Sequence, residues 1–167
     1  MSRIVTYLLG IWLFSLAGCG YYSFTGASIP EHLGTVAIPL VEDNTISTVS
    51  AMDEELTNLL VDRFVRQTKL SLEPNEASAD VLLSVTISQY QNSPTSVSGN
   101  EQATRNRVSI TATVRYQDQV QNKELLNRTF AAFEEYDPFT PSQEETAAFA
   151  ALEKIATDIF TAATSNW

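Results

Sequence analysis

Two stretches decide the fold of this chain: Ala79–Tyr90 (ADVLLSVTISQY) and Arg105–Gln117 (RNRVSITATVRYQ). In each stretch apolar side chains occupy every second position, and serine, threonine or arginine fills most of the positions between them. A period of two residues indicates a β-strand with one buried face. Residues 91–104, between the two stretches, are rich in Asn, Ser, Pro, Thr and Gly and predict a long flexible hairpin loop.

Three further strands are expected around this pair. Leu125–Tyr136 follows a turn at residues 118–123 and predicts a third long antiparallel strand. Thr35–Leu40 and Leu70–Glu73 are short β-type runs. Pro39 indicates that the first of these runs lies at a sheet edge or ends there, because proline lacks the N–H that a central strand needs.

Two helices are predicted from apolar residues that recur every three or four positions. The first covers residues 50–67, where Ser50 and Asp53 form a start motif. The second runs from about residue 141 to Thr164, and two pairs compete to start it: Thr140 with Pro141, and Ser142 with Glu145. Both helices are amphipathic, so each needs an apolar surface to cover.

The predicted fold class is therefore α+β. We expect a two-layer sandwich in which both helices pack on one face of a mainly antiparallel sheet of about four strands. The other face of this sheet is then rich in Ser, Thr and Arg and carries no helix. Residues 35–167 form this single domain, which is long enough to bury a core without disulfides.

Composition excludes several functions. The formal charge is −10, and the chain without residues 1–18 has 9 basic and 20 acidic residues, a net charge of −11. Such a protein is a poor ligand for nucleic acid, and it is not expected to lie flat on an anionic lipid surface. One cysteine and one histidine exclude an internal disulfide and the usual zinc ligand sets, so no metal or cofactor is expected.

The first nineteen residues predict export and lipidation. Arg3 precedes an uncharged apolar run, Ile4–Ala17, which is too short to span a membrane comfortably. The run ends in Leu16-Ala17-Gly18-Cys19, which resembles the lipobox of bacterial lipoproteins. We expect residues 1–18 to be a cleaved signal peptide, Cys19 to carry the lipid, and residues 19–34 to be a tether. Gly20 in place of Asp favours the outer membrane, by resemblance to enterobacterial sorting.

The uncovered sheet face has two interpretations. An antiparallel sheet can simply expose one face to water. Alternatively, this face meets a polar surface, such as the water-filled interior of an outer-membrane barrel. Half of the basic residues fall within 105–128 and are candidate contacts for a glycolipid or a barrel, although they could equally serve only to keep strand edges soluble: Arg105, Arg107, Arg115, Lys123 and Arg128.

Enzyme motifs are weak. A Ser-His-Asp site would have to use His32, which lies in the tether and is more simply a surface residue. Glu134 and Glu135 point to opposite faces of a strand, and Glu144 and Glu145 suit the first turn of a helix. There is no phosphate-binding glycine loop, so no catalytic residue is assigned.

The chain resembles the LptE family of lipopolysaccharide-assembly lipoproteins. The resemblance is carried by the segment from Leu16 to Phe24, the Ile29–Pro39 stretch, the helix from Ser50 and the closing helix. It implies a plug inside a large LptD-like outer-membrane β-barrel, which the plug helps to assemble and which delivers lipopolysaccharide to the cell surface. It also implies glycolipid binding through basic residues, which match only the Arg105–Arg115 region. The alternatives are an envelope-scaffold or secretion-system lipoprotein and, third, a lipid-anchored hydrolase.

Overall fold

The computed structural model describes residues 29–97, 103–140 and 142–165. The predicted signal peptide, Cys19 and most of the predicted tether lie outside these residues. The sheet is mixed and has six strands. Three long strands form an antiparallel meander: β4 (Val81–Val97), β5 (Ala103–Asp118) and β6 (Lys123–Tyr136). Three short parallel strands continue the same sheet beyond β4: β1 (Thr35–Ala37), β2 (Glu42–Asp43) and β3 (Ser71–Leu72).

The strand order is β3-β1-β4-β5-β6, and β2 also pairs with β4. The sheet has two strands more than the prediction of about four: β1 and β3 lie within the predicted runs 35–40 and 70–73, and β2 was not predicted. A 3-10 turn, η1 (Glu76–Ser78), connects β3 to β4. Pro39 lies just beyond β1, in agreement with a strand end, and β1 itself is an internal strand between β3 and β4.

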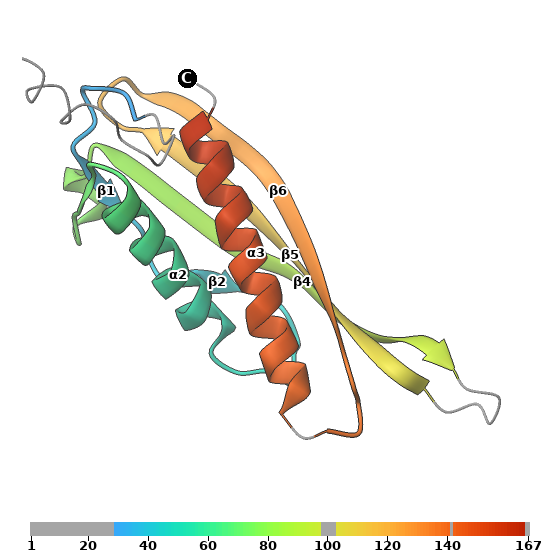
Figure 1. Cartoon of the computed structure of the whole chain (residues 1–167). Helices are drawn as coiled ribbons and strands as arrows, with labels where there is room; N and C mark the ends of the chain where they lie inside the picture. Colours follow the sequence, from blue (N-terminus) through green and yellow to red (C-terminus); the bar gives the residue numbers. More distant parts are fainter. Residues whose placement is uncertain (1–28, 98–102, 141, 166–167) are drawn as a thin grey trace, which may run out of the picture.

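Two helices cover one face of the sheet, as predicted: α2 (Met52–Gln67) and α3 (Gln143–Ser165) (Figure 1). α2 buries Met52, Leu56, Leu60 and Phe64, which are spaced four residues apart and so share one side of the helix. The Phe64 ring lies edge-on to Phe160 of α3, with 5.4 Å between ring centroids. The two-layer α+β sandwich is therefore confirmed, and no described helix is long and apolar enough to cross a membrane.

The start of α2 differs from its predicted motif, whereas α3 begins directly after Ser142, the second of its two predicted starts. α2 follows Ala51, whose φ is 60° and whose side chain makes no cap, so the predicted Ser50 start is wrong. α3 follows Ser142, which has a φ of 66°, and the Ser142 carbonyl accepts from Thr146 N at 3.2 Å. The Thr140 hydroxyl donates to Asp137 Oδ2 at 3.3 Å instead of capping the helix.

The predicted long hairpin loop is also wrong in extent. β4 continues to Val97 and β5 begins at Ala103, so most of residues 91–104 belong to the two strands. The pair runs beyond the helix layer as a two-stranded ribbon (Figure 1). A bulge between Ile87 and Gln89 reverses the alternation, and Tyr90 therefore pairs with Ile110 on the helix side.

A carboxylate on α3 joins the base of this ribbon to the helix layer. Glu144 Oε1 accepts from Tyr90 Oη at 2.6 Å and from Thr48 Oγ1 at 2.7 Å. Asn92 donates to Tyr136 Oη at 2.6 Å beside it. The hydrogen bond from Tyr90 is the largest influence on the pKa of Glu144, which lies below its ordinary value of 4.5 although partial burial acts in the opposite direction.

At the opposite end of the sheet, two aspartates bind the segment of chain that precedes β1. His32 Nε2 lies 2.7 Å from Oδ2 of Asp118, whose residue exposure is 1%. Burial acts to raise the pKa of Asp118, but the Gln121 N–H and His32 outweigh it and the pKa is lowered. Asp80 Oδ2 accepts from the N–H groups of Gly34 and Thr35. Leu33 is fully buried and Ile29 packs against the core, so the end of the predicted tether contacts the domain while Glu31, His32 and Gly34 stay exposed.

Glu144→Gln tests the carboxylate at the ribbon base. Because the folded-state pKa is lowered, this group stabilises the fold fully above about pH 4.5 and loses its effect as the pH falls through the folded-state value. We expect the variant to lose about 1 kcal/mol of unfolding free energy at pH 7. Urea unfolding at pH 7 and pH 3 should show the difference shrinking in acid. A difference that is equal at both pH values, or that the exposed neighbour Glu145→Gln reproduces, contradicts this role.

Candidate functional site

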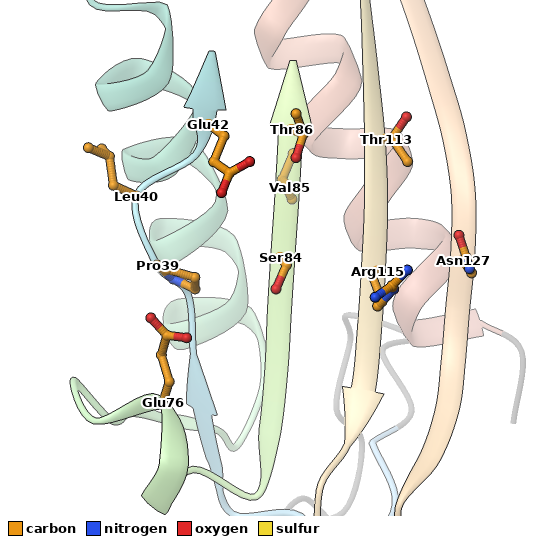
Figure 2. Close-up of a pocket in the computed structure, with 10 residues that line it drawn as sticks. All are labelled: Pro39, Leu40, Glu42, Glu76, Ser84, Val85, Thr86, Thr113, Arg115 and Asn127. Atoms are coloured by element: carbon orange, nitrogen blue, oxygen red, sulfur yellow. The ribbon is translucent and has the colours of Figure 1, made fainter. Parts of the chain in front are cut away.

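The candidate site is the sheet face away from the helices, which we call the open face. Both helices lie behind the sheet when it is viewed from this side (Figure 2). The alternation of buried and exposed positions in β4 and β5 puts hydroxyl, amide and arginine side chains here. The open face comprises Leu82, Ser84 and Thr86 of β4, Arg107, Ser109, Thr111, Thr113, Arg115 and Gln117 of β5, and Asn127, Thr129, Ala131, Phe133 and Glu135 of β6.

A shallow depression of about 410 Å³ lies on the open face. Ser84 and Thr86 form part of its floor, and Thr113 and Arg115 line the β5 side (Figure 2). The segment from β1 to β2 and the turn η1 supply the other wall, which consists of Pro39, Leu40, Glu42 and Glu76. The depression is polar and charge-separated, with carboxylates on one side and a guanidinium on the other.

Arg107 is committed to the sheet. Its guanidinium donates to Glu135 Oε1 at 2.7 Å across the β5–β6 pair. The same group lies over the Phe133 ring, 4.4 Å from the ring centroid. An arginine with a cross-strand partner and an aromatic surface is fixed in place and largely neutralised.

Arg115 is the more available cation. Its side chain is 65% exposed, and its Nε is 3.8 Å from Glu124 Oε2, a distance too long for a hydrogen bond. An exposed pair of this kind contributes little, so the guanidinium can turn toward a partner. Among the described positions of the open face, Arg115 is the basic side chain that borders the depression.

The structure divides the predicted basic cluster. Arg105 and Arg107 share the alternation of Arg115 on β5 and belong to the same side. Arg128 pairs with Val114, so it lies on the helix side of β6, where it is exposed and 5.4 Å from the Phe130 ring centroid. Lys123 lies at the start of β6, opposite Asp118. The five residues therefore do not form one patch, and whether any of them contacts a ligand stays a prediction.

Sequence reasoning missed one wall of the depression. Glu42 belongs to a two-residue strand and Glu76 to a three-residue turn, and neither element is long enough to show a period. It also missed the contact of His32 with Asp118, residues that are 86 positions apart. Among the described residues no group of three or more His, Cys, Asp or Glu side chains is placed to hold a metal.

The fold and this face define a two-layer α+β domain with a polar sheet surface. The family model of LptE, described as lipopolysaccharide-assembly, matches residues 33–163. The chain belongs to the LptE family, and it is accordingly a non-enzymatic lipopolysaccharide-assembly lipoprotein of the cell envelope. No curated protein sequence gives a significant match.

Solved structures share the fold. Lipoprotein B from Nitrosomonas europaea is 12% identical, with a TM-score of 0.59, and the match covers 86% of this chain and 88% of that one. Rare lipoprotein B from Shewanella oneidensis is 14% identical, with a TM-score of 0.56 and coverages of 77% and 92%. The hypothetical protein CT253 from Chlamydia trachomatis is 12% identical, with a TM-score of 0.55 and coverages of 80% and 99%.

The two arginines on the open face should respond differently to truncation. We expect Arg107→Ala to lower the free energy of unfolding by about 1 kcal/mol, because it removes an ion pair and the contact with Phe133. Arg115→Ala should change it by less than about 0.5 kcal/mol. Urea unfolding of the two variants measures the difference. Equal losses would show that Arg115 is as fixed as Arg107.

Proposed function

We propose that this chain is an outer-membrane lipoprotein that plugs a large LptD-like β-barrel, helps to assemble it, and presents its open face to the barrel wall. The observation that carries the proposal is the pairing of family membership with a polar sheet face that neither helix covers. The interior wall of an outer-membrane barrel is itself polar. Hydroxyl, amide and guanidinium groups suit such a wall, because each can exchange water for a hydrogen bond on docking.

The thickness of the domain sets a lower limit on the width of the barrel lumen that could hold it. A helix layer about 10 Å thick on a sheet about 10 Å away needs a lumen wider than small barrels provide. Barrels of about 22 strands or more have lumens of the plugged class. A lipid at Cys19, as the lipobox predicts, would keep the domain at the membrane and raise its effective concentration near such a partner.

Direct glycolipid binding is a smaller part of the proposal. Arg115 of the open face and Arg105, which follows the same alternation further along β5, have no ion pair of hydrogen-bonding length among the described residues, and guanidinium groups suit phosphate and carboxylate. Glu42, Glu76 and Glu124 lie near Arg115 and oppose an anion. Docking to a polar protein wall therefore fits the face better than holding an anionic headgroup alone.

A mild-detergent purification of the C-terminally tagged chain tests the proposal. We expect one large outer-membrane β-barrel to be recovered, and Thr113→Glu with Arg115→Glu to lower its recovery at least tenfold through repulsion and lost hydrogen bonds. Asn58→Glu with Arg66→Glu, on the exposed side of α2, makes the same change of net charge and is the matched control. Recovery of a periplasmic scaffold partner instead of a barrel would favour the envelope-scaffold alternative and contradict the proposal.

A second comparison tests glycolipid contact. Arg105→Glu with Arg115→Glu should weaken binding of purified lipopolysaccharide at least tenfold, more so at low salt. Lys123→Glu with Arg128→Glu makes the same change of net charge away from the open face and should have little effect. Arg107 is left intact because its ion pair holds two strands together. Equal effects of the two pairs would remove the assignment of the basic residues to a glycolipid.

A further inference from the structure

The outer edge of β6 is a long row of strand hydrogen-bonding groups. β6 ends the sheet, with β5 as its neighbour on one side (Figure 1). Gln119 N donates to Asp80 O at 2.8 Å, and this bond shows which backbone groups of β5 face β4. In an antiparallel strand the N–H and C=O of one residue point toward the same neighbouring strand, and successive residues alternate between the two neighbours. Because Gln119 bonds toward β4, the odd-numbered residues of β5 bond to β4 and the even-numbered residues bond to β6.

The same pattern fixes which residues of β6 face outward. The pairs Ala112 with Phe130 and Ile110 with Ala132 are the bonded ones, so even-numbered residues of β6 bond β5. The backbone groups of Asn127, Thr129, Ala131 and Phe133 consequently point away from the sheet. One hydrogen bond within the described part of the chain reaches them, from Lys154 Nζ to Phe133 O at 3.4 Å.

This edge has room beside it. A second depression, about 380 Å³, follows β6 where α3 lies over it. Ala131, Ala132 and Phe133 line one side, and Lys154, Thr157 and Asp158 of α3 line the other. Phe133 is 52% exposed, and the alanines leave space for the side chains of an added strand. An exposed edge of this length and composition is a template for pairing with another strand.

The charged side chains of β6 are complementary to those of a second β6 that runs antiparallel to it. Arg128 and Glu134 both lie on the helix side and are placed symmetrically about Ala131, and Glu134 also forms an ion pair with Lys154 of α3. A second β6 running antiparallel, with Ala131 opposite Ala131, places Thr129 opposite Phe133 and Arg128 opposite Glu134. On α3, Lys154 and Asp158 repeat the pattern of opposite charges one turn apart.

We propose that β6 pairs with β6 of a second copy of this chain, antiparallel and centred on Ala131. The pairing joins two six-stranded sheets into one and keeps the open face of each copy exposed. Lys154 gives up its contact with Phe133 O and remains beside the Glu134 and Arg128 pair. This inference concerns the chain without a barrel partner and does not rest on the proposed function.

Disulfide trapping of the full chain in mild detergent tests the register. In Ala131→Cys the two introduced residues face each other with about 5.5 Å between Cα atoms, within the range of a disulfide. In Thr129→Cys the two copies are about 13 Å apart. We expect mild oxidation to give at least tenfold more covalent dimer with Ala131→Cys than with Thr129→Cys or the unsubstituted chain. Equal yields from the two variants overturn the proposal.

Ala131→Pro tests the edge itself. Proline removes one outward N–H and leaves the bonds to β5, because Ala131 does not donate to that strand. Sedimentation velocity should show the unsubstituted chain as a dimer at about 100 µM and the variant with at least a tenfold higher dissociation constant. Equal melting temperatures would show that the variant is folded. An unsubstituted chain that stays monomeric, or a variant that dimerises equally well, overturns the proposal, as does capture of a different protein along this edge.

Discussion

The period-two alternation of β4 and β5 is the constraint on which the rest of the molecule depends. Because successive side chains of a strand point to opposite faces, every apolar residue at one parity faces the helices, and every hydroxyl or arginine at the other faces away. A slip of one residue would exchange the two faces. The core formed by Val85, Ile110, Phe64 and Ile155 and the polar open face are therefore two results of the same register.

The sequence predicts secondary structure correctly where the apolar pattern extends over many residues. Three long strands, both helices and the side that the helices cover follow from periodicity, since each pattern extends over ten or more residues. It was insufficient where structure depends on distant partners. β2 has two residues and forms only because Ile87 and Thr86 of β4 are beside it. Ser50 satisfies a start motif that the backbone at Ala51 bypasses, and residues 91–97 look like a loop until β5 pairs with them.

The candidate site shows the same division. Arg107 and Arg115 were placed on the correct face by alternation, while their different roles depend on Glu135 and Phe133, which belong to another strand. Arg128 is close to these residues in sequence but lies on the helix side. The acidic wall at Glu42 and Glu76 comes from short elements without a period. The net effect is a face that is polar and only locally basic, in a strongly acidic chain that belongs to the LptE family.

The central claim is that the face without helices is the one that meets the partner. Photo-crosslinking in intact cells tests it most directly, with one photoreactive residue replacing Thr113 on the open face or Thr157 on the exposed side of α3. The account predicts a covalent adduct with a large outer-membrane β-barrel from position 113 that is much stronger than any from position 157. An adduct formed from position 157 alone would contradict it.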